Sequence, residues 1–319
     1  MTFPAHVPVA AVTRGNLVES VHFGSLVVLG ADSNELLSVG DPQGAVYARS
    51  SLKLLQAVAM LRHGFTGNPQ QVALACASHS GERFHLDTVT SILADAGLTE
   101  ADLQNTPDLP IGVVAHAAAM RAGLEPSSLM QNCSGKHAAM LATCRVNGWP
   151  TASYLNPGHP LQQAIAQTLE DLMGEKIHSV TFDGCGAPVF AFSLTALARS
   201  FAHVAREGAA NPNSPEGQVY HAMCGNPAFV GGTDRDVTDM MIAFPGLITK
   251  DGAEAVEAGA FADGSAFAVK VADGGHRART VLSLRALDIL GYRDQTLTDK
   301  HMPKVLGHGK PVGIVTALV

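Results

Sequence analysis

The stretch Arg49-Ser50-Ser51-Leu52-Lys53-Leu54-Leu55 marks the point at which the chain changes from strand-forming to helix-forming sequence. Apolar residues recur after it at helical spacing, which predicts an amphipathic helix over 51–63. Ser50 would lie at the start of this helix, and Lys53, three positions later, on the same face. A lysine beside a serine can act as the general base for a nucleophilic hydroxyl. A helix cap and a solvated lysine are the ordinary alternative for so short a pattern.

The sequence before this point is typical of an antiparallel meander, and strand-forming sequence returns near the end of the chain. Valine-rich alternation defines the first two strands, and a turn at 32–34 leads into the third. A helix is predicted between the late strands, over 276–290, where Gly291 ends it. The predicted strands are 6–13, 17–30, 36–39, 254–260, 265–272 and 311–319.

The middle of the chain is rich in alanine and indicates helices joined by loops. Glycine ends several of the periodic segments, as at Gly148 and Gly174, which is typical of helix C-termini. One short strand is predicted within this region, over 179–182. The predicted helices are 51–63, 69–76, 82–96, 115–122, 134–147, 160–173, 190–207, 215–224 and 235–243.

Strands at both ends and helices between them predict an α/β protein of the α+β kind. We expect one antiparallel sheet built from both chain ends, flanked by an early and a late helix, with an inserted helical lobe. The sheet lobe would comprise 1–50 and 245–319, and the helical lobe 51–244, in one compact unit. A cleft between two lobes is a usual place for a small-molecule site.

Composition excludes several classes of partner. The 319 residues carry a net charge of −7 and no cluster of Lys and Arg, so no nucleic-acid partner is expected. No uncharged apolar run reaches membrane-spanning length, so no membrane partner is expected either. Residues 1–6 lack the charged and apolar parts of a signal peptide, and the five cysteines are an odd number. We therefore expect a cytoplasmic protein with reduced thiols.

Three further segments concentrate small and reactive residues around turns, where loops and helix caps are the ordinary explanation. They are Cys76–Glu82 (C-A-S-H-S-G-E), Asn132–His137 (N-C-S-G-K-H) and Asp183–Gly186 (D-G-C-G). The remaining cysteines are expected to be small buried apolar residues. Those are Cys76, Cys144 and Cys224.

Cys133 and Cys185 differ because both lie in turns beside polar residues. Two thiolates can anchor zinc, whose usual protein ligands are Cys and His. Lys136 follows Cys133 by three positions and could turn to the same side, binding a metal as the neutral amine. His137 is the more ordinary ligand. The C-x-x-C pairs of common zinc sites are absent, so spacing alone leaves the site open.

Lys250 lies in a segment similar to the K-T-G motif that faces the nucleophile in serine enzymes with an S-x-x-K pair. The middle residue departs from that motif, because Asp251 stands in the place of threonine. A plain β-turn with a solvated lysine is the alternative.

Together these segments resemble the asparaginases similar to the inducible rhizobial enzyme, also called class 3 asparaginases. The resemblance extends from about residue 8 to the end of the chain. It implies hydrolysis of L-asparagine to L-aspartate and ammonia, a fold similar to serine β-lactamases and glutaminases, and a homodimer. The motifs that carry it are A-R-S-x-x-K (48–53), C-A-S-H-S (76–80), N-C-S-G-K-H (132–137), D-G-C (183–185) and K-x-G-A (250–253).

The resemblance also implies roles for individual residues. Ser50 with Lys53 would form one catalytic pair, and Ser78 with Lys250 the other. The residues implied as zinc ligands are Cys133, Lys136 and Cys185. The residues implied around the substrate are Arg49, His137 and Asp183.

Three alternatives remain open at the level of sequence. The first is a glutaminase or another serine amidohydrolase of the same fold, such as a β-lactamase or a peptidase. The second is a non-catalytic zinc-binding protein in which Ser50 only caps a helix. The third is a thiol enzyme that uses Cys133 with His137, four positions apart on one helix face. Ammonia release from asparagine and glutamine, measured together with bound zinc, distinguishes them.

Overall fold

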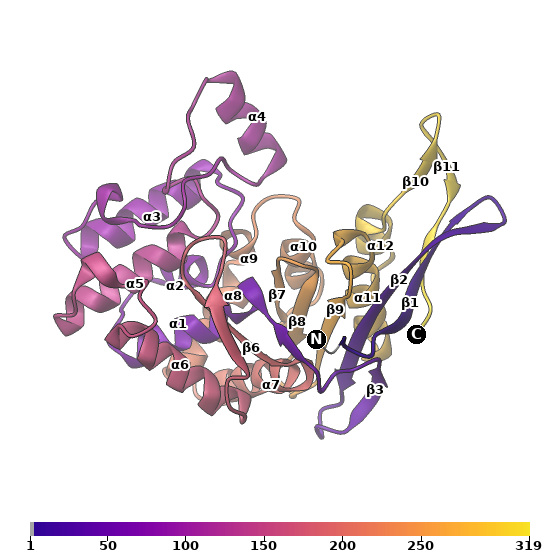
Figure 1. The fold of residues 1–319 in the computed structure, drawn as a ribbon, viewed down its shortest axis with the longest axis horizontal. Coiled ribbons are helices and arrows are strands. Elements are labelled where there is room, and N and C mark those ends of the chain that lie inside the picture. Colours follow the sequence, from indigo (N-terminus) through magenta and orange to yellow (C-terminus); the bar gives the residue numbers. More distant parts are fainter. Residues whose placement is uncertain (1–2) are drawn as a thin grey trace.

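A computed structural model describes residues 3–319, and its centre is an antiparallel sheet drawn from both ends of the chain (Figure 1). The strand order is β12-β1-β2-β9-β8-β7, and β3 pairs with β2 beside this path. The expected fold class is thereby confirmed. The strands are β1 (Val7–Arg14), β2 (Leu17–Leu29), β3 (Glu35–Val39), β7 (Ile248–Gly252), β8 (Val256–Ala260), β9 (Ala266–Val271) and β12 (Val315–Ala317).

The middle of the sheet is where the two chain ends meet, because β2 pairs with β9. Alternate residues of β2 point to opposite faces. Leu26 and Val28 join a core with α11 (His276–Ile289), whereas Val27 and Leu29 join the larger core on the other face. That other face is covered by α7 (Leu194–Ala210), which packs on β2, β8 and β9. The sheet is therefore flanked by helices on both sides.

The helix that follows Ser50 differs from the prediction. A 3₁₀ turn, η1 (Arg49–Leu52), leads into α1 (Lys53–Arg62), and every residue of α1 from Lys53 to Leu61 is buried. A helix buried on all sides belongs to the interior of a core, not to its surface. Accordingly α1 packs on α2, α5, α6 and α8. The amphipathic character expected for the helix over 51–63 is therefore wrong, and the face of the sheet expected to carry an early helix carries α7.

The helices of the middle region follow the sequence pattern closely. For α5 and α6 the bounds are those predicted, and each ends at a left-handed glycine, Gly148 or Gly174. Besides α1 and α7, the helices of this region are α2 (Pro69–Ala75), α3 (Arg83–Asp95), η2 (Glu100–Asp102), α4 (Val113–Arg121), α5 (Ser134–Asn147), η3 (Thr151–Ser153), α6 (Pro160–Met173), α8 (Pro215–Gly225), α9 (Pro227–Val230) and α10 (Asp236–Ala243).

A smaller sheet connects the helices to the start of η1. Its order is β4 (Ala45–Tyr47), β6 (Pro188–Ser193) and β5 (Ser179–Phe182). The helix predicted over 190–207 is wrong at its start, because residues 190–193 lie in β6 and pair with its neighbours. Ser193 then caps α7 by accepting a hydrogen bond from the Ala196 N–H. This sheet brings Arg49, two residues after β4, close to the β5–β6 turn.

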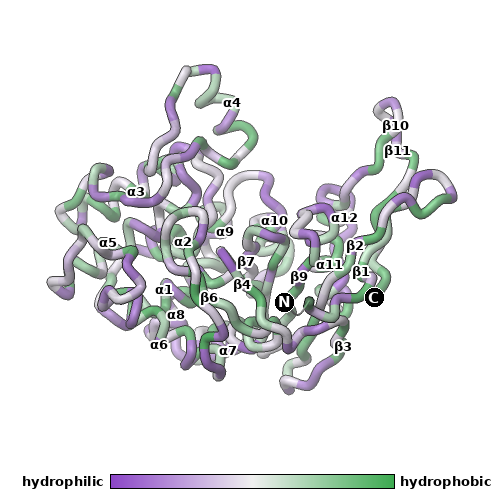
Figure 2. Tube along the Cα trace, in the orientation of Figure 1, coloured by the Kyte–Doolittle hydropathy of each residue, from purple (hydrophilic) through white to green (hydrophobic). Residues whose placement is uncertain are grey.

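The end of the chain adds α12 (Gln295–His301), β10 (Val305–Gly307) and β11 (Lys310–Gly313), of which only β11 overlaps a predicted strand. The β10–β11 hairpin lies beside the β1–β2 hairpin, and both extend beyond the sheet (Figure 1). The residues of β1 that lie in the core are hydrophobic and are coloured green in Figure 2. None of the helices within 3–319 has the length and apolar character to cross a membrane. The division into two lobes stays a prediction.

Candidate active site

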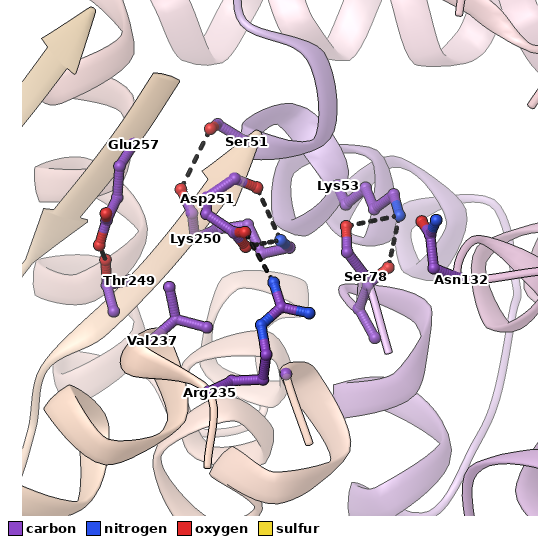
Figure 3. Close-up of polar contacts among 12 residues, drawn as sticks. Ser51, Lys53, Ser78, Asn132, Arg235, Val237, Thr249, Lys250, Asp251 and Glu257 are labelled. Carbon is purple, nitrogen blue, oxygen red and sulfur yellow. Dashed lines mark hydrogen bonds and ion pairs between the residues drawn. The ribbon is translucent and has the colours of Figure 1, made fainter. Parts of the chain in front are cut away.

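Lys53 is the point at which three of the motifs meet. Its side chain is 1% exposed, and its amine donates to the Ala77 carbonyl at 2.6 Å and to Ser78 Oγ at 3.0 Å (Figure 3). A third hydrogen bond runs to Cys133 Sγ at 3.1 Å. These acceptors come from the loop after α2 and from the residue that precedes α5. One amine therefore joins the S-x-x-K, C-A-S-H-S and N-C-S-G-K-H segments.

The loop that carries Ser78 is held from two sides. Its backbone N–H groups donate to Val230 O from Ser78 and to Asn132 O from His79. The ring of His79 accepts from the Gly81 N–H at Nδ1, so Nε2 carries the proton and donates to Ser134 Oγ at 2.9 Å. Burial keeps the pKa of His79 well below its usual value, so this ring stays neutral. The loop is thus braced against the first turn of α5.

The hydrogen-bond pairing of serines and lysines differs from the pairing that the resemblance implies. Lys53 pairs with Ser78, not with Ser50. The Ser50 side chain is half-buried and forms no hydrogen bond with any residue of 3–319. Ser50 and Lys53 remain three positions apart on one continuous helical segment and therefore share a face. Lys250, expected beside Ser78, is hydrogen-bonded to Asp251 instead.

Lys250 lies in β7, its side chain is fully buried, and its amine contacts the next residue of the same strand. It donates to the Asp251 carbonyl at 2.7 Å and to Asp251 Oδ1 at 2.5 Å, while Arg235 donates to the other carboxylate oxygen at 2.9 Å (Figure 3). Burial lowers the pKa of Lys250 to about 8, against the opposing effect of Asp251. Ser51 Oγ donates to the Lys250 carbonyl at 3.1 Å, which connects η1 to β7.

Gly252 explains how β7 and η1 approach so closely. A Cβ atom at this position would lie 2.7 Å from the Ala48 carbonyl oxygen, too close for any side chain. The K-x-G pattern therefore has a structural reason, because the glycine admits the backbone that precedes Ser50. A plain turn with a solvated lysine is not what the structure contains, since Lys250 is buried in a strand.

Arg49 and Asp183 form an ion pair at the edge of this region. Arg49 donates to Asp183 Oδ1 from Nε at 2.9 Å and from a terminal nitrogen at 2.7 Å, and both side chains keep some exposure. Arg49 has a φ of 52°, a left-handed conformation uncommon for a residue with a Cβ. Although burial alone would raise it, the pKa of Asp183 is lowered by Arg49 and Lys136. Two residues predicted near the substrate are thus in contact.

Cys133, Lys136 and Cys185 also come together. Cys133 immediately precedes α5, Lys136 lies in its first turn, and the Lys136 amine contacts Cys185 Sγ at 3.3 Å. The proximity of the two sulfurs holds the pKa of Cys185 well below its usual value and, together with burial, raises that of Cys133 to about 12. Negative charge on the sulfurs raises the pKa of Lys136, although burial opposes this. The pair is an ammonium beside a thiolate.

This cluster offers two sulfur atoms and one nitrogen atom, a donor set that suits zinc if the amine gives up its proton. Within 3–319 no group of three or more His, Cys, Asp and Glu side chains is arranged to hold a metal ion. A site at this position would therefore depend on Lys136 as a ligand.

His137 is enclosed by protein. Its Nδ1 lies 2.7 Å from the Tyr154 hydroxyl, and its Nε2 has no hydrogen-bond partner within the described residues. Burial keeps the pKa of His137 well below its usual value. The Cys133 thiol donates to Asn132 Oδ1 at 3.1 Å and is not paired with this imidazole. The arrangement gives no support to a thiol enzyme built on Cys133 and His137.

Several residues of this region had no part in the sequence prediction. Asp251 left a signal, because it replaces the threonine of the K-T-G pattern. Arg235 left none, since a single arginine before a helix is unremarkable in sequence. Asn132 lies within a motif, and its carbonyl and side chain both receive hydrogen bonds there. Arg235 and the Asn132 carbonyl each contact a residue distant in sequence, Asp251 and His79, and motif spacing does not encode such contacts.

Comparison with known proteins gives one result for nearly the whole chain. A protein-family model described as L-asparaginase II matches residues 10–317. No curated protein sequence matches the chain.

Proposed function

The chain belongs to the L-asparaginase II family, and on that premise we propose that it hydrolyses L-asparagine to L-aspartate and ammonia by nucleophilic serine catalysis. The observation that carries the mechanism is the buried contact between the Lys53 amine and Ser78 Oγ, at 3.0 Å. All three acceptors around this amine are uncharged groups. Within the described residues no carboxylate is hydrogen-bonded to it, and the proposed mechanism uses the amine in its neutral form, in which it accepts a proton from a hydroxyl.

The two serines near Lys53 differ in exposure, and this supports different roles for them. Ser50 is half-buried at the start of the helical segment and lies on the same face as Lys53. Ser78 is only 7% exposed and holds the amine. We assign Ser50 as the nucleophile and Ser78 as the hydroxyl that orients Lys53 and exchanges protons with it.

The reaction then follows in two halves. Ser50 Oγ attacks the side-chain amide carbon, and its proton moves to Lys53. The tetrahedral intermediate collapses, Lys53 returns the proton to the leaving nitrogen, and ammonia departs from an aspartyl ester on Ser50. Lys53, neutral again, takes a proton from water, whose oxygen attacks the ester. Aspartate leaves, and the proton returns to Ser50 Oγ.

Two features support stabilisation of the oxyanion that forms in each half. Ser50 lies at the start of the η1–α1 segment, where the positive end of the helix dipole favours developing negative charge. At pH values below its pKa of about 8, Lys250 carries positive charge on the neighbouring strand. Ser51, next to the nucleophile, is hydrogen-bonded to that strand. We propose that Lys250 acts as the ammonium form.

The Arg49–Asp183 pair offers both charges that an amino acid requires. We propose that Arg49 binds the α-carboxylate of the substrate and Asp183 its α-ammonium group. Both side chains are partly exposed, which supports contact with a ligand. His137 is fully enclosed, so a direct role at the substrate stays a prediction, and its contact with Tyr154 supports a structural role in α5.

We propose zinc as the cofactor, held by Cys133, Lys136 and Cys185. When bound, the metal would supply a Lewis-acidic open position that helps to orient the substrate. The proposal is supported by two neighbouring buried sulfurs and an amine in contact with one of them. Asp183 lies near enough to Lys136 for their charges to interact, so this cluster adjoins the proposed substrate-binding pair.

The finer assignments stay predictions. Membership of the class 3 subgroup rests on the five motifs quoted from the sequence. The homodimer and the cytoplasmic location also rest on sequence alone. Glutamine differs from asparagine by one methylene, and such a difference is worth only about 1–3 kcal/mol in a binding pocket. Side activity on glutamine is therefore part of the test.

The experiment is to incubate the purified protein with L-asparagine and, separately, L-glutamine, and to measure ammonia and bound zinc on the same sample. We expect ammonia release that is faster with asparagine and is lost in Ser50→Ala. Ser214→Ala, which removes a serine at the cap of α8, is the matched control and should keep the parent rate. Faster release from glutamine would make the protein a glutaminase. Zinc without ammonia from either amide would identify a non-catalytic zinc-binding protein.

A further inference from the structure

Asp251 lies between two cations and divides its carboxylate between them. Oδ1 accepts from Lys250 at 2.5 Å, and Oδ2 accepts from Arg235 at 2.9 Å (Figure 3). We propose that Arg235 is a positioning residue for Lys250 and acts through Asp251. Arg235 binds one oxygen of the Asp251 carboxylate, which leaves only the other oxygen for Lys250. This fixes the position of the Lys250 amine.

The segment that carries Arg235 is also attached to the loop of Ser78. Val230 accepts from the Ser78 N–H at 3.2 Å, and Gly231 accepts from Ser80 Oγ at 2.9 Å. Five residues after Val230, Arg235 reaches the strand of Lys250. One short segment therefore spans from the serine loop to β7. The ion pair at its far end fixes Lys250 relative to Ser78.

A second ion-pair chain supports this arrangement from behind. Asp236, next to Arg235, accepts from Arg279 at 2.6 Å, and Arg279 also pairs with Glu257 of β8. Glu257 in turn contacts Thr249, the neighbour of Lys250 on β7. Because Arg279 is already shared by two carboxylates, Arg235 is the residue left to satisfy Oδ2 of Asp251.

The charges around Lys250 act in opposite directions. The carboxylate of Asp251 raises the pKa of Lys250, whereas Arg235 and Lys53 lower it together with burial. Burial alone would raise the pKa of Asp251, but the charges of Lys250, Arg235 and Arg279 hold it well below its usual value. The titratable and charged groups that act on this lysine are Asp251, Arg235, Lys53 and Cys76, and the charges that act on Asp251 from behind are Asp236, Glu257 and Arg279.

Removing each partner should therefore move the Lys250 titration in opposite directions. In Arg235→Gln the carboxylate of Asp251 turns wholly to the lysine, so its midpoint rises. In Asp251→Asn the lysine loses its only anionic hydrogen-bond partner among the described residues and keeps the cations, so its midpoint falls. Loss of a close charge partner changes a pKa by about one unit or more. A residue that only stabilised the fold would not produce shifts of opposite sign.

The test is a pH titration of the intact protein with ¹³Cε-labelled lysine, followed by NMR. The Lys250 signal is assigned by its absence in Lys250→Met. We expect a midpoint at a pH of about 8 in the parent protein, the pKa of Lys250. It should rise by about one pH unit in Arg235→Gln and fall by about one in Asp251→Asn. Arg235→Lys, which keeps the charge, should stay within about half a unit of the parent.

Matched controls come from Arg83→Gln and Asp87→Asn, which remove another Arg–Asp pair on the exposed face of α3. Neither should move the Lys250 midpoint. Shifts of the same sign in Arg235→Gln and Asp251→Asn, or no shift in either, would overturn the proposal. If Arg235→Gln does not fold, Arg235→Lys and Asp251→Asn still decide it, because the first must leave the midpoint in place and the second must lower it.

The role in turnover rests on the proposed function, whereas the titration does not. With Lys250 active as the ammonium, kcat for ammonia release should fall above the Lys250 midpoint. That limb of the pH profile should follow the NMR midpoint upward in Arg235→Gln and downward in Asp251→Asn. Failure of the parent protein to release ammonia would count against the proposed function alone. If the alkaline limb of the kcat profile does not follow the NMR midpoints in these two variants, Arg235 has no positioning role in the reaction.

Discussion

The candidate site contains two buried lysines, Lys53 and Lys250, which differ in the groups that surround their amines. Lys53 contacts a carbonyl, a hydroxyl and a thiol, which come from segments distant in sequence. Lys250 contacts the carboxylate of the next residue, and that carboxylate is shared with an arginine. The residue type is the same, but one amine faces neutral groups and the other lies in a network of charges.

The two surroundings suit the two amines to different steps of amide hydrolysis. An amine among neutral acceptors can exchange its proton with a neighbouring hydroxyl. Burial lowers the pKa of Lys250 to about 8 against the opposing charge of Asp251, so this amine is charged below that pH and is then suited to stabilise an oxyanion. The helical region supplies the first amine and the sheet supplies the second. Variants on each side should therefore fail in different ways.

The largest effect is expected on the helical side. Lys53→Met keeps the length of the side chain but removes the base, and should lower kcat for asparagine hydrolysis by about 1,000-fold or more. Ammonia release at saturating substrate measures it. Lys176→Met, at an exposed surface ion pair, should leave kcat unchanged. Activity of Lys53→Met within about tenfold of the parent would exclude Lys53 as the general base.

On the sheet side, Lys250→Met should lower kcat by about 100-fold, the usual cost of losing one oxyanion-stabilising group. It should also abolish the fall of kcat above the Lys250 pKa of about 8, since the titrating group is gone. The pH profile of kcat across that midpoint is the measurement. A retained alkaline limb would mean that another group causes it, and the contrast between the two lysines would then lose its functional basis.

Metal removal tests the cluster that adjoins the helical side. Cys185→Ala should lose bound zinc, and it should raise KM for asparagine by about tenfold while kcat changes less, because the proposed metal orients the substrate. Metal analysis and steady-state kinetics on one preparation give both values. Cys224→Ala, at a half-buried cysteine away from this cluster, should keep its zinc. Zinc-free protein with unchanged KM and kcat would exclude orientation by the metal.

The smallest effect on turnover is expected from the charge network behind Lys250. Arg279→Met leaves Glu257 and Asp236 buried without their partner, and should lower the free energy of unfolding by about 3–5 kcal/mol. Below the unfolding temperature, kcat should change only a few-fold. Urea unfolding measures the first value. The exposed neighbour Arg277→Met should stay within about 0.5 kcal/mol of the parent. An Arg279→Met protein that is as stable as the parent would contradict the view that this ion-pair network stabilises the sheet side.

Local sequence predicted the fold well wherever the signal was also local. The bounds of α5 and α6 follow from apolar periodicity closed by glycine, and both were predicted. The start of α7 was not, because the continuous apolar run 189–192 can belong to a buried strand or to a helix until its partners β4 and β5 are known. The burial of α1 on all sides also depends on helices elsewhere in the chain.

The candidate site was predictable in its members but not in its pairing. Motif patterns identified Lys53, Ser78 and Cys133, yet their mutual contact spans up to 80 positions and arises only in the folded chain. The expected partners of Ser78 and Lys53 were therefore not those observed. Asp251 was visible as a departure from a motif, whereas Arg235 had no sequence signal at all. Short sequence motifs do not encode long-range ion pairs, and this part of the site was therefore not predicted.

The central claim is that a serine beside Lys53 forms an ester with the substrate. It is tested most directly by mixing the protein with L-asparagine, quenching rapidly in acid, and mapping the modified peptide by mass spectrometry. We predict one aspartyl group on Ser50 in the parent protein and none in Lys53→Met. An aspartyl group on Cys133, or ammonia release with no covalent intermediate on Ser50 or Ser78, would contradict the account.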